Sequence, residues 1–251
     1  MKKLLLCLIL IFNCSVCFGS LNCGGDSGTE DMVIYSSDLG INSYPFTICV
    51  KWDPTAYAQN IIASLHNSGV GNNYYYLEMA QATNVVQIVA RNTDFNDNQG
   101  TTNIGSGVHT VCGVWAGNAD RKIYVDGKSN EIQGGIVSTS FNTSTNQFSI
   151  CGSDDSTPTS NAQKILEIAV WSAELTESES AQYANGDLRR VPLQIQPSNL
   201  ILYSLFDDYP DGTTSMGGNT FRDESGNGNN GSLVDTDGDT TALAEIILSY
   251  P

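Results

Sequence analysis

A glycine- and asparagine-rich acidic loop near the C-terminus is the segment best suited to hold a metal ion. Asp223 opens the run Asp-Glu-Ser-Gly-Asn-Gly-Asn, which contains Gly226 and Asn227. Calcium takes about six to eight oxygen ligands, which carboxylates, amide side chains and turn carbonyls supply. Glu167, in a late apolar run, could add a second carboxylate. The sequence therefore predicts a calcium site of Asp223, Gly226, Asn227 and Glu167. The alternatives are a plain turn for the loop and an ordinary surface position for Glu167.

A second acidic run, Asp235-Thr-Asp-Gly-Asp239, superficially resembles the calcium loop of helix-loop-helix proteins. It has Thr240 where that loop needs glycine at its sixth position, and Ile246 where it needs glutamate at its twelfth. A solvated acidic turn is the expected structure here.

The most aromatic stretch is Tyr74-Tyr75-Tyr76. On a strand, Tyr74 and Tyr76 share one face and Tyr75 takes the other. Exposed rings can stack on the faces of sugars while their hydroxyls form hydrogen bonds. Tyr74 and Tyr76 are thus candidate ligand-binding residues, with packing between strands as the alternative.

Catalytic chemistry finds little support in the sequence. His66 and His109 are far apart in the chain, and neither has a recognisable nucleophile partner. Motifs of the Gly-x-Ser-x-Gly, phosphate-loop and paired zinc-ligand kinds are missing. We expect a protein that is not an enzyme.

The N-terminus has the pattern of a secretory signal peptide. Lys2 and Lys3 precede an apolar stretch from Leu4 to Phe18, which is shorter than the roughly 20 residues of a membrane-spanning helix. Small residues at Gly19 and Ser20 suit cleavage after Gly19, and no later stretch predicts a transmembrane segment. The residues before Cys23 fit a lipoprotein poorly. We expect a secreted, extracellular or periplasmic protein.

Export permits disulfides. Four cysteines remain after residues 1–19, and an even number in an oxidising compartment allows pairing. Four cysteines permit three pairings, and the sequence does not choose among them. Because several lie in apolar runs, buried free thiols are an equally good alternative. The disulfide candidates are Cys23, Cys49, Cys112 and Cys151.

The charge balance excludes one class of partner. The chain carries 27 acidic and 11 basic residues, a formal net charge of −16. Without Lys2 and Lys3, nine basic residues face the 27 acidic ones, and the net charge becomes −18. Nucleic-acid binding depends on Lys and Arg neutralising phosphates. We therefore expect no nucleic-acid partner; solubility is the ordinary consequence of such acidity.

Over most of the chain, the sequence pattern predicts short strands separated by turn residues. Apolar, β-branched and aromatic runs predict strands, and Asp126-Gly127 is a strong hairpin signal. Many short strands with little helix predict an all-β, two-sheet antiparallel sandwich. A single helix over 177–184 is expected, opened by the capping box Thr176–Glu179 and ended by Asn185-Gly186. The expected strands are Met32–Tyr35, Phe46–Trp52, Tyr74–Met79, Val85–Ala90, Val108–Trp115, Lys122–Val125, Phe148–Cys151, Ile165–Trp171 and Leu200–Phe206.

An ordered set of runs over about residues 30–187 resembles the laminin-G-like, concanavalin A-type jelly roll of secreted bacterial and phage-associated proteins. The runs are Phe46–Trp52, Arg121–Gly127, Phe148–Gly152, Ile165–Trp171 and Leu175–Ser180. The resemblance implies a jelly-roll sandwich and a structural calcium near the chain termini. It departs from the family at Val108-His109-Thr110, where members often have a Trp-His-His element.

The family's usual opening strand and its Asp-x-Ser-Gly-Asn-Gly-Asn loop are found at the wrong end of this chain. The matching passage is Leu200–Phe206 followed by Asp223–Asn229. Either this segment completes the sandwich in permuted order, or it begins a truncated second unit. The first interpretation divides the chain into a signal peptide (1–19), a jelly roll (20–188) and a C-terminal segment (189–251) that completes the same sandwich.

The resemblance implies a secreted, non-catalytic module that recognises a glycan or another cell-surface component. One alternative is a structural or assembly protein that makes protein–protein contacts. The other is a glycoside hydrolase, since laminarinase-type enzymes share the fold. Those enzymes need paired carboxylates, whereas Glu167 has none at the i+2 or i+4 position. The oligomeric state does not follow from the sequence.

Overall fold

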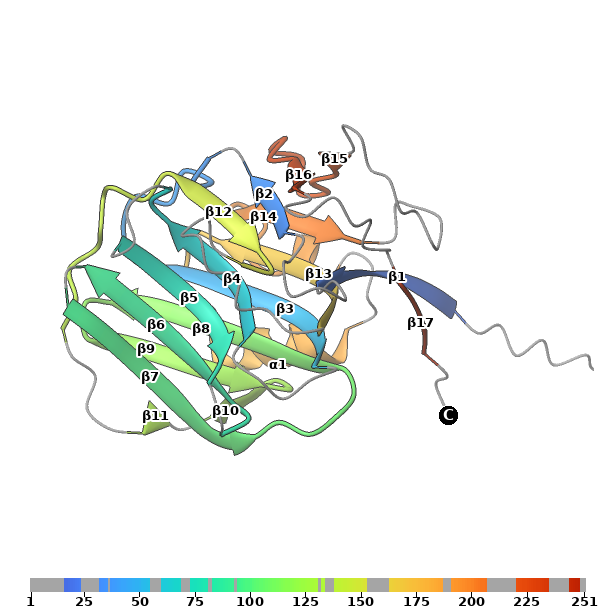
Figure 1. Cartoon of the computed structure of the whole chain (residues 1–251), viewed down its shortest axis with the longest axis horizontal. Coiled ribbons are helices and arrows are strands. Elements are labelled where there is room, and N and C mark those ends of the chain that lie inside the picture. Colours follow the sequence, from blue (N-terminus) through green and yellow to red (C-terminus); the bar gives the residue numbers. More distant parts are fainter. Residues whose placement is uncertain are drawn as a thin grey trace, which may run out of the picture.

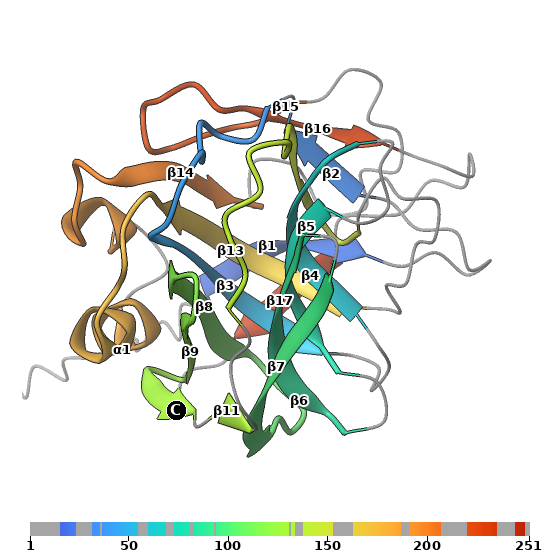
Figure 2. The same cartoon turned by 90° about the vertical axis from the view of Figure 1, so that its left-hand side faces the viewer.

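Two antiparallel sheets packed face to face make up the molecule (Figures 1 and 2). This confirms the predicted jelly-roll sandwich. The computed structural model describes residues 16–23, 32–35, 37–54, 60–68, 73–80, 83–92, 94–130, 132–133, 138–152, 163–186, 191–206, 220–234 and 244–248.

The first sheet has eight strands, in the order β10-β9-β8-β3-β13-β1-β17, with β14 also paired to β13. Both β1 and β14 therefore lie along the same side of β13, one after the other. The strands are β1 (Val16–Cys23), β3 (Phe46–Pro54), β8 (His109–Gly117), β9 (Asp120–Val125), β10 (Lys128–Asn130), β13 (Gln163–Trp171), β14 (Leu200–Leu205) and β17 (Ala244–Leu248).

The second sheet has nine strands, in the order β11-β7-β6-β5-β4-β12-β2-β16-β15. Its middle strands lie in front of the first sheet in Figure 1. The strands are β2 (Met32–Tyr35), β4 (Asn60–His66), β5 (Asn73–Met79), β6 (Val85–Asn92), β7 (Asp94–Asn103), β11 (Ile132–Gln133), β12 (Gln147–Ile150), β15 (Thr220–Phe221) and β16 (Gly231–Val234).

Alternation along each strand builds the main core between the sheets. In β5, Tyr75, Leu77 and Met79 point inward, and the residues between them point to the outer face. The facing strands of the eight-stranded sheet supply apolar partners such as Ile48 and Val50. Trp52, Trp115 and Trp171 are fully buried.

The one α-helix in the described residues, α1 (Glu177–Asn185), covers the outer face of the eight-stranded sheet (Figure 2). The predicted capping box is present: Thr176 Oγ1 accepts from the Glu179 backbone N–H, and the Glu179 carboxylate accepts from the Thr176 N–H. Tyr183 buries its ring against Trp171. A short 3₁₀ turn, η1 (Pro192–Gln194), leads from the helix toward β14. None of the helices in the described part of the chain is long and apolar enough to span a membrane.

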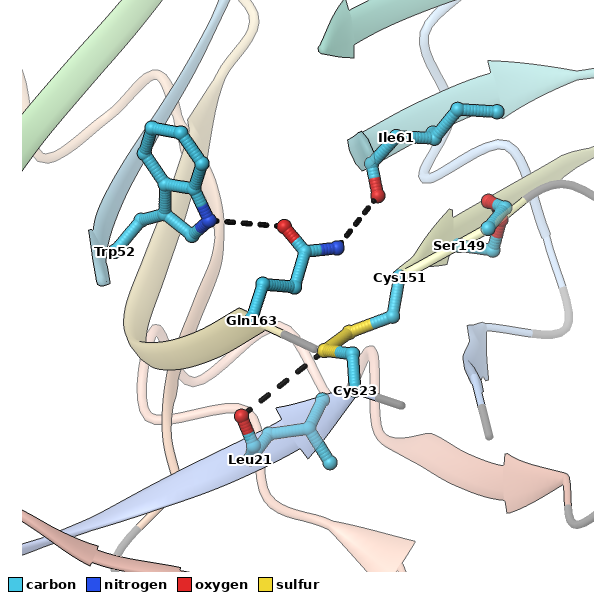
Figure 3. Close-up of a disulfide and its surroundings, with 8 residues drawn as sticks. Leu21, Cys23, Trp52, Ile61, Ser149, Cys151 and Gln163 are labelled. Carbon is cyan, nitrogen blue, oxygen red and sulfur yellow. Dashed lines mark hydrogen bonds between the residues drawn. A yellow bond between two sulfur atoms is a disulfide. The ribbon is translucent and has the colours of Figure 1, made fainter. Parts of the chain in front are cut away.

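Two disulfides join the four cysteines whose pairing the sequence left open. Cys49 and Cys112 face each other on β3 and β8, on the helix side of the sheet. Cys23 and Cys151 connect the end of β1 to the residue after β12, and therefore connect the two sheets (Figure 3). Beside this bond, Gln163 accepts from Trp52 Nε1 at 2.8 Å and donates to the Ile61 carbonyl at 3.0 Å, which adds a polar link between the sheets (Figure 3).

The C-terminal strand β14 lies beside β13 in the first sheet and contributes Leu202 and Phe206, the residue after it, to the main core. At the N-terminus, Val16 to Ser20 pair with β17, whereas Leu21 to Cys23 pair with β13. Cleavage after Gly19, which stays a prediction, leaves the part of β1 that the Cys23–Cys151 bond fixes. The acidic run 235–239 lies outside the described residues.

Candidate functional site

The outer face of the nine-stranded sheet carries polar and aromatic side chains where the inner face is apolar. Strand register aligns Arg91, Tyr74, His66 and Gln147 in a row across β6, β5, β4 and β12. A second row contains Val89, Tyr76, Ser64 and Ser149. We call these two rows, together with Glu78 and Gln87, the polar sheet face.

Tyr74 and Tyr76, the predicted ligand-binding residues, lie side by side on this face, as the alternation predicted. Their rings stack at 3.9 Å between centroids with an interplanar angle of 6°. Arg91 lies over the Tyr74 ring, 5.6 Å from its centroid, and Arg91 Nη1 donates to Tyr74 Oη at 3.1 Å. The rings are only 7% and 8% exposed, so they pack against this face and are not free platforms. A ligand-binding role for them stays a prediction.

A buried serine–histidine group occupies the centre of the face. Ser64 Oγ lies 2.9 Å from His66 Nδ1 and 2.7 Å from Ser149 Oγ, and both serines reach the Gly152 carbonyl. Each hydroxyl carries one proton, so the contacts are best satisfied when Nδ1–H of His66 donates to Ser64. A nucleophilic serine requires a histidine that accepts its proton. In that tautomer His66 does not accept the Ser64 proton.

Two acceptors on the polar sheet face have no hydrogen-bond partner among the described residues. The Gln87 side chain donates to the Glu78 carboxylate, which leaves Gln87 Oε1 unused. Gln147 Oε1 is the other buried acceptor, at the end of the first row. Buried polar atoms are normally paired. These two oxygens are therefore buried acceptors whose hydrogen-bond donor the described residues do not supply.

Sequence reasoning missed Arg91, Gln87 and Gln147. Arg91 and Gln87 lie on β6 and Gln147 lies on β12, so they share a face with Tyr74 only through strand register. The hairpin of β5 and β6 offered one usable signal. Pairing Tyr74–Met79 with Val85–Ala90 would have brought Gln87 opposite Glu78, on the face of Tyr74 and Tyr76.

The Asp223 loop forms hydrogen bonds along the edge of β14. The Asp223 carboxylate accepts from the backbone N–H groups of Tyr203, Ser225 and Asn229, at 3.1, 2.9 and 3.0 Å. Asn227 and Asn229 donate to the carbonyls of Leu200 and Ile201. An unpaired strand edge leaves such groups unsatisfied. The loop, which we call the edge clamp (residues 223–229), thus satisfies the free edge of β14.

The predicted calcium ligands do not converge on one centre. Gly226 lies in the exposed turn of the edge clamp with a φ of 89°, while the Asp223 oxygens are engaged by N–H donors. Glu167 belongs to a separate cluster beneath α1. Among the residues that the structure describes, no three His, Cys, Asp or Glu side chains form a metal-binding group. The described donors therefore do not fit the predicted site, and calcium binding stays a prediction.

Glu167 is fully buried, which corrects the expectation of an ordinary surface position. Its carboxyl lies 3.7 Å from Lys51 Nζ and accepts from Tyr203 Oη at 3.4 Å. Lys51 also donates to the Gly186 carbonyl at 3.1 Å and lies over the Tyr183 ring. Burial raises the pKa of Glu167 to about 7, although Lys51 and the hydroxyls of Tyr183 and Tyr203 act in the opposite direction. Glu167 and Lys51 thus form a buried polar contact beneath α1.

His109 is paired with a turn residue. Its Nδ1 lies 2.9 Å from Asp126 Oδ2, and this bond raises the pKa of His109. Asp126 begins the predicted hairpin turn, where Asp126 and Gly127 have φ values of 50° and 73°. Both values match a type I′ turn, so this contact supports the β9–β10 hairpin.

Comparisons with solved structures give the same fold at low sequence identity. A Bacteroides ovatus protein whose name proposes carbohydrate binding matches with a TM-score of 0.61 and 16% identity, over 90% of this chain and 61% of that one. The Ruminococcus gnavus IT-sialidase CBM40 bound to α2,3-sialyllactose matches at 0.53 and 14%, over 68% and 99%. A heptameric SAP-like pentraxin from Limulus polyphemus matches at 0.51 and 13%, over 70% and 83%.

No curated protein sequence matches this chain. A family model, described as the concanavalin A-like lectin/glucanases superfamily (Laminin_G_3), matches residues 26–180, more than half of the sequence. This confirms the resemblance drawn from the strand motifs. The chain belongs to the concanavalin A-like lectin/glucanase superfamily.

Proposed function

We propose that this chain is an exported, non-catalytic module that recognises carbohydrate through its polar sheet face. The observation that carries the proposal is the pair of buried acceptors without a described partner, Gln87 Oε1 and Gln147 Oε1. A buried acceptor without a donor costs about 1–3 kcal/mol, so a ligand that brings donors gains by binding there.

Sugar hydroxyls match the chemistry of this face. Each hydroxyl donates one proton and accepts others, and the face combines the two open acceptors with the guanidinium of Arg91. Arg91 is partly exposed at one end of the first row, and Gln147 is partly exposed at the other. Because Tyr74 and His66 between them are buried, a glycan would reach this row at its two ends, a donor at Arg91 and an acceptor at Gln147.

The likeness to carbohydrate-binding proteins supports the proposal at the level of fold. The Bacteroides ovatus protein and the CBM40 module share the sandwich architecture, and the latter was solved with a sialylated sugar. Function depends on the site and not on the fold. The proposal for this chain therefore rests more on the residues of the polar sheet face than on the shared fold.

The chemistry of the described groups supports a non-catalytic role. Retaining glycosidases place two carboxylates about 5 Å apart. Glu167 instead lies beside Lys51 beneath the helix, and the Ser64 hydroxyl contacts both His66 and Ser149. Export rests on the predicted signal peptide and on the two disulfides, which persist in oxidising compartments.

A broad glycan array probed with the mature protein, with and without calcium, tests the proposal. We expect binding to at least one glycan class. Gln147→Leu should weaken that binding about tenfold without lowering the melting temperature, since this acceptor has no protein partner to lose. Gln194→Leu, an exposed glutamine on η1, is the matched control and should bind as the wild type does. A protein that binds no glycan under either condition would move the assignment to a structural role.

A further inference from the structure

We infer a second sugar-contact surface at one loop end of the sandwich, formed by Tyr44 and Phe141 and suited to a neutral hexopyranose. This inference rests on the proposed function and adds a site and a ligand class to it. Tyr44 precedes β3, and Phe141 lies in the segment that leads into β12. We call the two residues the aromatic corner.

Exposure singles these residues out. Every aromatic side chain whose burial the structure describes is buried, except those of Tyr44 and Phe141. The two exceptions are 97 positions apart in sequence, yet their rings meet at 5.3 Å between centroids with an interplanar angle of 89°. Partly exposed aromatic rings that gather at one point are a frequent feature of recognition surfaces.

The aromatic corner is held in place before any ligand arrives. Tyr44 Oη donates to the Thr139 carbonyl at 3.0 Å, and the Asn142 N–H donates to Tyr75 Oη at 2.7 Å. The Phe141 ring stacks on Tyr75 at 5.3 Å, and Tyr44 stacks on Phe46 at 6.1 Å. Rigid contact residues lose little conformational entropy on binding. Two rings at right angles, fixed in this way, present a preorganised apolar surface to the C–H face of a sugar ring.

The surroundings select a neutral sugar. Residues 41–45 and 138–146 contain no Asp, Glu, Lys or Arg, and their exposed members are small polar residues and one proline. Asn42, Ser43 and Thr143 therefore offer hydrogen bonds without charge. The chain as a whole carries a net charge of −16, which disfavours acidic sugars. Arg121, whose guanidinium hydrogen-bonds the Tyr44 hydroxyl, is a charged neighbour of the corner, but it is buried. A neutral hexopyranose therefore suits the apolar corner and its uncharged exposed rim.

Leucine substitutions of the two rings provide the test, with array glycans as probes. Tyr44→Leu and Phe141→Leu remove the aromatic faces but keep apolar volume, so each should weaken binding of a neutral glycan about tenfold. Tyr124→Leu, which changes a buried ring on the helix side of the eight-stranded sheet, is the control for general loss of packing. Should the leucine variants unfold, Phe141→Trp keeps a stacking surface, and the emission of its indole should shift when glycan saturates the protein.

The outcomes separate this inference from the proposed function. Wild-type protein that binds no glycan overturns both. The aromatic corner alone is overturned if binding weakens with Gln147→Leu but is unchanged by Tyr44→Leu and Phe141→Leu. It is also overturned if glycan saturates Phe141→Trp without shifting the emission of its indole. Exclusive binding of acidic glycans with a steep dependence on salt overturns the neutral class. Selective loss of neutral-glycan binding in the leucine variants supports it.

Discussion

Glu167 illustrates how one buried carboxyl makes folding depend on pH. Its pKa is raised to about 7 by burial, above the ordinary value of 4.5, despite Lys51 at 3.7 Å. Between these two pH values the unfolded chain has lost the proton and the folded protein keeps it. The stabilising contribution of the neutral carboxyl is therefore fully present below pH 4.5 and is lost as the pH rises through 7.

The consequence is measurable by urea unfolding from pH 4 to pH 8. Titration of Glu167 should lower the wild-type free energy of unfolding by roughly 3 kcal/mol as the pH rises from 4.5 to 7. In Glu167→Gln this component should be missing, because the amide does not titrate. Tyr203→Phe, which removes one hydroxyl from the carboxyl, should keep the dependence. Equal pH dependence of Glu167→Gln and wild type would show that the carboxyl is ionised throughout.

At the scale of elements, the edge clamp and β14 depend on one another. Asp223→Ala removes the acceptor of three backbone N–H groups, one of them on β14. We expect a loss of about 1–3 kcal/mol for each donor that stays buried and unpaired. Because these partners are protein groups, the loss should be the same in chelator and in calcium. Thermal melts of both proteins under both conditions measure it.

The same melts decide the calcium prediction. A bound ion stabilises the folded form by mass action. If chelator lowers the wild-type melting temperature and Asp223→Ala abolishes that sensitivity, a calcium site involving Asp223 exists, and the hydrogen bonds of the edge clamp are not its whole role. If chelator does not change the wild-type melting temperature, the edge clamp acts through its protein hydrogen bonds alone.

The C-terminal segment is predicted to be part of the same sandwich. β14 pairs with β13 from Leu200 to Leu205, and Leu202 and Phe206 lie in the main core. Truncation after Gly186 should therefore expose a strand edge and part of the core, and yield an unstable or aggregating protein. Solubility and thermal melting of residues 20–186 test this. A soluble fragment that melts cooperatively at the full-length temperature would make the segment an appendage.

Sequence patterns predicted the elements that are dense in β-formers, and missed those that are not. Phe46–Trp52 and Ile165–Trp171 became β3 and β13, with boundaries shifted by two residues. β7 was missed because Asp94–Asn103 is polar and contains Gly100. Its place in the sheet depends on its pairing with β6, a tertiary preference that overrides local propensity.

The candidate sites were less predictable than the fold. Alternation placed Tyr74 and Tyr76 on one face, but their burial depends on packing that no local pattern encodes. The disulfide pairing was open for the same reason, since Cys23 and Cys151 are 128 positions apart. Tyr44 and Phe141 lie in separate loops, and only the closed sandwich brings them together.

For the whole molecule, the central claim is that this jelly roll binds a glycan and leaves it intact. The most direct measurement titrates the best array glycan, as a free oligosaccharide, into the mature protein by calorimetry, and then assays the same mixture for new reducing ends. We predict saturable binding that weakens in Gln147→Leu, with the oligosaccharide unchanged after prolonged incubation. Binding without dependence on Gln147, or turnover that disappears in Glu167→Gln, would contradict the account.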